Sequence, residues 1–135
     1  MARVTRFEDL VAWQRSRALA SAIYRITFRG ALARDYSMQR QLRSAALSIP
    51  SNIAEGFERF RPKEFHHFLS IAKASCAEVR SQLYVAFDLE YITEDVLITL
   101  RQQAESAART IGKLRASVER RIKPPSTQHP APSTK

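Results

Sequence analysis

Cysteine, glycine and long hydrophobic runs are all scarce in this chain of 135 residues. The single cysteine, Cys76, excludes an intramolecular disulfide. The three glycines, Gly30, Gly56 and Gly112, lie too far apart to form a glycine-rich phosphate-binding loop. The sequence has no run of about 18 apolar residues and no charged-then-apolar leader, so we expect neither a membrane span nor a signal peptide. These absences favour a cytoplasmic protein with one domain and an ordinary hydrophobic core.

Acidic residues are also few compared with basic ones. The chain carries 22 Lys and Arg against 13 Asp and Glu, a formal net charge of +9. Residues 1–63 have 12 basic and 5 acidic side chains, residues 64–95 have 2 and 6, and residues 96–135 have 8 and 2. We therefore assign the basic surface to the first half and the last helix, not to the third helix. Such a surface attracts polyanions in a salt-dependent way, although it is also compatible with a merely soluble basic protein.

Apolar residues recur at helical spacing over four long stretches. We predict helices at about 8–28, 36–59, 62–90 and, after an N-cap at Thr93, 94–122, with residues 30–35 as a short connection. Four long helices with short links predict an all-α, antiparallel, up-down-up-down four-helix bundle over residues 1–122. Residues 123–135 contain four prolines among Ser, Thr and Gln, which predicts a disordered tail. The last helix has the most regular apolar spacing, at Leu97, Leu100, Ala104, Ala107, Ile111, Leu114 and Val118.

The first predicted helix has an unusually wide apolar arc. Its apolar residues, which include Trp13 and Tyr24, spread over more than half of the helix circumference. A helix that packs against a single bundle core needs a narrower apolar stripe. We therefore predict that this helix is covered on two sides, by its own domain and by another copy of the chain.

Pro50 interrupts the second predicted helix, and polar residues align beside it. A proline removes one backbone donor and crowds the carbonyl four residues earlier, which predicts a kinked helix. In the interpretation we favour, Asn52 and nearby serines satisfy carbonyls freed by the proline, Glu55 pairs with Arg59, and Gly56 admits another helix. The alternative is a polar pocket for a ligand. The structural stripe comprises Ser48, Pro50, Asn52, Glu55 and Gly56, flanked by Gln41 and Arg59.

Residues with catalytic or metal-binding chemistry are isolated from one another. Glu64 and His67 have the Glu-x-x-His spacing of di-iron bundles, but no second copy occurs, and His66 and His67 are adjacent and diverge on a helix. Cys76 falls on the apolar seam of the third helix, where a small buried residue is the usual role. We predict no enzyme activity, no metal and no cofactor.

Basic residues form stripes along the predicted helices. Stripes of this kind suit phosphate backbones and carry little sequence information, while a solvated outer face is the alternative. The candidate nucleic-acid contacts are Arg15, Arg25 and Arg29 on the first helix, Arg40 and Arg43 on the second, and Arg109, Lys113 and Arg120 on the fourth.

Three segments carry a family resemblance. They are Phe7-Glu8-Asp9-Leu10-Val11-Ala12-Trp13, residues 41–56 with their Ser-Ile-Pro-Ser-Asn-Ile-Ala-Glu-Gly run, and residues 64–78. The chain resembles the small four-helix bundle proteins encoded within bacterial 23S rRNA intervening sequences, and it is similar to the accessory variability protein of diversity-generating retroelements.

The resemblance implies a homo-oligomeric ring of bundles, a pentamer, with a basic surface for nucleic acid and no catalytic residues. It also implies a reverse transcriptase as partner, if this copy belongs to a retroelement. We therefore predict a non-enzymatic homopentamer that binds RNA or DNA with low sequence specificity. The alternative is a protein-interaction scaffold that does not bind nucleic acid.

Overall fold

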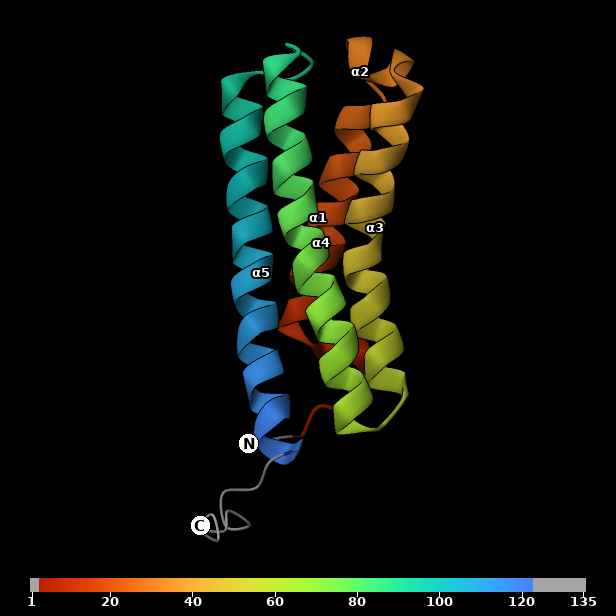
Figure 1. Cartoon of the computed structure of the whole chain (residues 1–135), viewed down its shortest axis with the longest axis vertical. Coiled ribbons are helices and arrows are strands. Elements are labelled where there is room, and N and C mark those ends of the chain that lie inside the picture. The colour runs from red at the N-terminus through yellow and green to blue at the C-terminus, as the bar shows by residue number, and fades with distance from the viewer. Residues whose placement is uncertain (1–2, 123–135) are drawn as a thin grey trace, which may run out of the picture.

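A computed structural model describes residues 3–122, and Figure 1 shows their path. The predicted tail, residues 123–135, lies outside the described residues. The described part contains helices and no strand. The elements are a 3-10 helix, η1 (Phe7–Asp9), and the α-helices α1 (Val11–Thr27), α2 (Gly30–Arg34), α3 (Tyr36–Glu58), α4 (Pro62–Asp88) and α5 (Glu94–Ile122).

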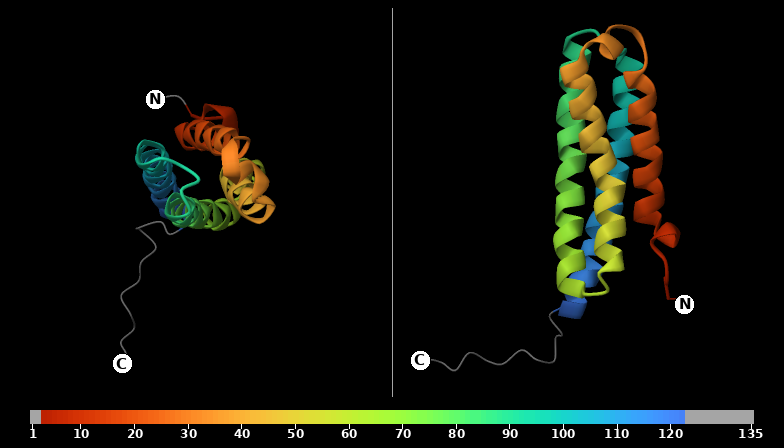
Figure 2. Two further views of the ribbon diagram at one scale, coloured as in Figure 1. Left: turned by 90° about the horizontal axis from the view of Figure 1, so that it is seen from above. Right: turned by 90° about the vertical axis from the view of Figure 1, so that its right-hand side faces the viewer.

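The four long helices form a closed ring of neighbours. Helix α1 packs against α3 and α5, and α4 packs against the same two helices from the other side. Successive long helices run in opposite directions, as the colour sequence shows in Figure 1 and in the right-hand view of Figure 2. The prediction of an all-α four-helix bundle is confirmed. Within residues 3–122, no helix is both long enough and apolar enough to cross a membrane.

Two predicted boundaries differ from the structure. The first long helix begins at Val11, because Leu10 adopts an extended backbone and buries its side chain, and the residues before it form the 3-10 turn η1. The predicted connection at residues 30–35 contains the short helix α2, whose Leu32 is fully buried. That buried leucine holds the link against the end of the bundle.

Side-chain caps define the starts of α3 and α5. Oδ1 of Asp35 accepts the backbone N–H of Met38 at 3.1 Å, and Oγ1 of Thr93 accepts that of Val96 at 3.3 Å, as the capping pattern predicts. Tyr91, in the link between α4 and α5, donates its hydroxyl to Oδ2 of Asp35 at 2.8 Å. The hydrogen bond from the Met38 N–H is the main cause that lowers the pKa of the Asp35 carboxyl, and the bond from the Tyr91 hydroxyl is the second. The Tyr91–Asp35 hydrogen bond also raises the pKa of Tyr91. One carboxylate thus joins the two links at this end of the bundle.

The apolar arc of α1 is only partly covered by its own chain. Leu19 and Ile23 are fully buried, whereas Trp13 and Tyr24 are half-buried at the margin of the core. Val11 is half exposed. The single chain therefore leaves part of this arc open, and its coverage by another copy stays a prediction.

Helix α3 continues through Pro50 without a break, and the predicted bend stays a prediction. The Asn52 amide donates to the backbone oxygen of Ser48 at 2.7 Å and to its Oγ at 2.8 Å. The prediction that Asn52 satisfies the carbonyl freed by Pro50 was wrong. That carbonyl belongs to Ala46, four residues before the proline. The Asn52 side chain donates to Ser48 instead, because Ser48 lies one helical turn before Asn52. Oγ of Ser48 also lies 3.0 Å from Oγ of Ser75 on α4. The stripe thus links α3 to α4.

The remaining stripe residues take the places predicted for them. Nη2 of Arg59 lies 3.1 Å from Oε2 of Glu55 in an exposed ion pair. Gly56 is buried where α4 crosses α3, and a Cβ added there would lie 2.6 Å from Cβ of Phe68 and 3.0 Å from Cδ1 of Phe65. Only a residue without a side chain permits this approach of the two helices.

We predict that Gly56→Ala and Gly112→Ala have opposite effects on stability. Both remove a helical glycine, which favours the helix by about 0.5–1 kcal/mol. At Gly56 the added methyl group collides with Phe68, so overpacking should cost about 1–3 kcal/mol and outweigh that gain. At Gly112 the nearest atom is Cε of Lys73 at 3.7 Å, so the gain should remain. Urea unfolding of both variants measures this, and equal shifts would contradict the crossing at Gly56.

Candidate nucleic-acid interface

A shallow basic groove runs between α4 and α5. It consists of two adjoining hollows of about 580 and 350 Å³. Its floor is made of small residues, which leave space above the backbones of the two helices. These residues are Ala74 and Ala77 of α4 and Ala108, Gly112 and Ala116 of α5.

Positive side chains line both walls of the groove. Glu105 is the one carboxylate among the lining residues, 3.9 Å from Nη1 of Arg80 and 3.8 Å from Nε of Arg101. Ion pairs that solvent can reach contribute little free energy, so a phosphate can compete with Glu105 for these cations. The cations that line the groove are Lys73 and Arg80 on α4 and Arg109, Lys113 and Arg115 on α5.

Helical spacing brings these cations together. Lys73 and Arg80 are seven residues apart, two turns along one face of α4, and Arg109 and Lys113 are one turn apart on α5. Arg115 is held in place, because its Nε donates to Oγ of Ser70 at 2.9 Å. The groove therefore presents one cation that is fixed by a hydrogen bond, Arg115, beside the four other basic side chains.

Sequence reasoning found Arg109 and Lys113 but missed Lys73, Arg80 and Arg115. Residues 64–95 have an acidic balance, and this led us to exclude the third helix from the basic surface. A segment's net charge does not show which face each charge occupies. The seven-residue spacing of Lys73 and Arg80 is the signal that could have found them.

Two of the arginines predicted to contact nucleic acid make hydrogen bonds within the bundle instead. Nη1 of Arg15 donates to Oγ1 of Thr110 at 2.8 Å and to Oγ of Ser106 at 3.2 Å, which ties α1 to α5. Nε of Arg43 donates to Oγ1 of Thr27 at 2.8 Å, and its guanidinium lies over the rings of Tyr24 and Phe28, 5.1 and 4.5 Å from their centroids. Neither arginine lines the groove.

The other four predicted contacts are exposed but separate from the groove. Arg25, Arg29 and Arg40 lie where α1 ends and α3 begins. Arg120 lies at the opposite end of the molecule, in the last turn of α5. The structure thus places two of the eight predicted residues, Arg109 and Lys113, in one basic groove.

Cys76 is fully buried on the inner face of α4, as the seam pattern predicts. Burial raises the pKa of its thiol to about 11, more than the nearby charges of Arg80 and Lys73 lower it. Nε2 of His66 on α4 lies 3.4 Å from Oε1 of Glu119 on α5. In residues 3–122, no three His, Cys, Asp or Glu side chains come close enough to hold a metal ion.

Comparisons with known proteins agree with this fold. The family model described as 23S rRNA-intervening sequence protein matches residues 8–113. A crystal structure described as a protein with unknown function from the S23 ribosomal protein family of Bacteroides thetaiotaomicron is similar, with a TM-score of 0.71 and 20% sequence identity. That similarity covers 78% of this chain and 98% of the other. A search of curated proteins finds no match.

We predict that Cys76 reacts slowly with thiol reagents in the folded protein. At pH 8 the thiol is almost entirely protonated, because its pKa of about 11 lies well above that pH, and the thiolate is the reactive form. Alkylation followed by mass spectrometry should show little modification at pH 8 and rapid modification in denaturant. Fast modification of the folded protein would contradict the buried position.

Proposed function

Because the chain belongs to the 23S rRNA-intervening sequence protein family, we propose that it is a non-enzymatic, homo-oligomeric bundle that binds RNA or DNA with low sequence specificity. The observation that carries this proposal is the basic groove between α4 and α5. The proposal assigns no reaction and no cofactor to the protein.

The shape and charge of the groove suit a phosphate backbone. Lys73 and Arg80 are about 10 Å apart along α4, which corresponds to about three base-pair steps along the axis of a duplex. Lysine and arginine contact phosphates through charge, and each good contact displaces condensed counterions. The floor of alanines and one glycine offers no side chain that could read a base edge, so binding should be nearly independent of sequence.

Exposed apolar residues on the α1 and α3 side support the oligomeric part of the proposal. A hollow of about 340 Å³ lies there, lined in part by Phe7, Trp13, Leu47 and Pro50. Leu47 is half exposed although it lies within a long helix. An apolar patch of this kind is typical of a protein contact, and we propose that a second copy covers it. The number five follows from the family resemblance.

We predict that Lys73→Gln/Lys113→Gln weakens nucleic-acid binding by a similar factor for every sequence tested. Removal of two phosphate contacts should reduce the slope of log K against log salt by about 1.8 for a DNA duplex and by about 1.4 for a single strand. Glu105→Gln should change affinity in the opposite direction, because it removes the carboxylate of the groove. Fluorescence anisotropy with unrelated RNA and DNA strands at several salt concentrations measures both effects.

The matched control is Arg34→Gln/Lys63→Gln, which removes the same charge from exposed positions outside the groove. It should leave the salt slope nearly unchanged. Equal losses in the two double variants would mean that total charge, and not the groove, determines binding. If the wild-type protein binds no strand at low salt, the nucleic-acid proposal fails and the protein-scaffold alternative gains support.

We predict that Leu47→Glu converts the oligomer to a folded monomer. The residue is half exposed in the single chain, so the substitution should hardly affect folding, whereas a carboxylate inside an apolar contact is costly. Light scattering gives the mass of each form, and circular dichroism shows whether the helices persist. Leu89→Glu, at an equally exposed position in the C-cap of α4, serves as the control. A wild-type protein that is monomeric at micromolar concentration would contradict the proposal.

A further inference from the structure

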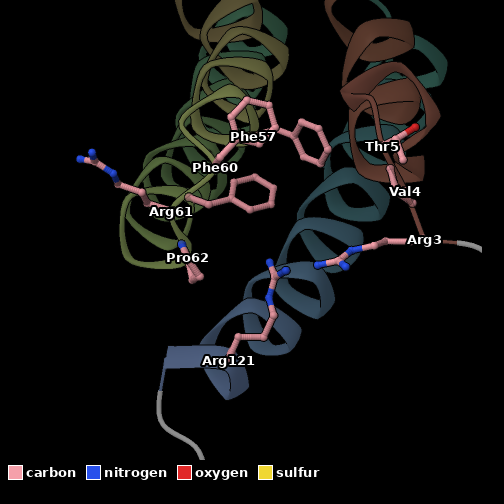
Figure 3. A pocket seen from close by; sticks show the side chains of 9 residues that line it. Arg3, Val4, Thr5, Phe57, Phe60, Arg61, Pro62 and Arg121 are labelled. Carbon is pink, nitrogen blue, oxygen red and sulfur yellow. The ribbon is translucent and has the colours of Figure 1, made fainter.

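A separate cavity lies at the end of the bundle where α3 passes to α4 and α5 ends. Its volume is about 540 Å³, within the range of small-molecule sites. Figure 3 shows that three parts of the chain converge on it: the N-terminal segment, the turn after α3 and the last turn of α5. The lining residues are Arg3, Val4, Thr5, Phe57, Phe60, Arg61, Pro62, Phe65 and Arg121.

Aromatic rings form one wall of this cavity. The rings of Phe57 and Phe65 meet edge to face with their centroids 5.7 Å apart, and the centroid of the Phe60 ring lies 6.3 Å from that of Phe57. Phe60 is 77% exposed, and its backbone is in the left-handed region with a φ of 58°. Glycine is the usual residue in this position after a helix, and a residue with a Cβ costs about 1–2 kcal/mol there. The chain thus keeps a large apolar ring open to solvent on an unfavourable backbone.

Two arginine side chains, Arg3 and Arg121, lie opposite the rings. The third arginine of the lining, Arg61, points away from them in Figure 3 and pairs with Oε2 of Glu64 at 3.0 Å. Arg3 and Arg121 have no carboxylate within ion-pair distance among residues 3–122. In Figure 3 their guanidinium groups point toward one another across the mouth of the cavity. Two like charges that converge in this way form a binding position for an anion, which would relieve their repulsion.

We propose that this cavity binds one unpaired nucleotide of the bound strand, with its base against the Phe60 ring and its phosphate between Arg3 and Arg121. This inference rests on the proposed function and adds the class of nucleic acid. A flat base stacks on an aromatic ring whatever its identity, so the site is compatible with low sequence specificity. Paired bases inside a duplex have no free face to offer. The preferred ligand is therefore a strand with an unpaired end.

The test compares three probes of the same sequence: a blunt duplex, the duplex with a short unpaired tail, and the duplex with a tail of equal length that lacks bases. The abasic tail keeps the phosphates, so the difference between the two tailed probes isolates base stacking. Stacking on an aromatic ring contributes about 1–3 kcal/mol per base, so the normal tail should bind at least about fivefold more tightly than the abasic tail.

Phe60→Gly should abolish the preference for the normal tail and leave blunt-duplex binding unchanged. This variant relieves the left-handed backbone, so its melting temperature should equal or exceed that of the wild type. Glu90→Gly is the matched control, because Glu90 has a φ of 62° and follows the C-cap of α4, at the other end of that helix from Phe60. It should keep the preference. Arg121→Gln should weaken both tailed probes equally, since it removes a phosphate contact.

The outcomes separate the two proposals. If the wild type binds the blunt duplex but does not distinguish the tails, the nucleotide pocket is wrong and the proposed function stands. If it binds none of the probes at low salt, the proposed function fails and the pocket fails with it. If Phe60→Gly lowers the mass measured by light scattering, the ring contacts another copy of the chain, which also overturns the pocket.

Discussion

The close approach of α4 to its two neighbours is the constraint on which the rest of the molecule depends. On one side, Gly56 lets Phe68 lie against the backbone of α3, and the hydroxyls of Ser48 and Ser75 meet between the same helices. On the other side, α4 packs along α5, and small residues line the groove between them. Since α4 contacts both α3 and α5 but not α1 to a comparable extent, its position closes the ring of four helices.

Both candidate binding surfaces follow from this packing. The groove exists because small residues, and not large ones, separate Lys73 and Arg80 from Arg109 and Lys113. The end cavity exists because α3 must turn sharply into α4, which places Phe60 outside the core on a left-handed backbone. Helix α5 contributes cations to both surfaces. A polyanion that followed α5 would therefore meet charge in the groove and again at the end of the bundle.

The sequence was sufficient to predict the bundle but only part of the candidate interface. Helical periodicity, Pro62 at the start of α4 and the Thr93 cap give the long helices to within a few residues, because these signals are local. The short helix α2 was missed because its stability depends on Leu32 reaching the core, which is a long-range contact. Charge balance concealed Lys73 and Arg80, and no local signal shows that Arg15 and Arg43 are used within the bundle. The convergence of Arg3 and Arg121, at opposite ends of the sequence, can be seen only in three dimensions.

Trp13 gives the protein a built-in optical reporter. It is the only tryptophan of the chain, and it is half-buried against Phe7, with ring centroids 5.2 Å apart, and beside Arg17, 5.5 Å from its ring. It also lines the apolar hollow between α1 and α3, and it does not line the groove or the end cavity. The wavelength and quenching of its emission therefore report the hydration of that hollow. The intrinsic fluorescence of the unlabelled protein can in this way distinguish subunit contact from ligand capture.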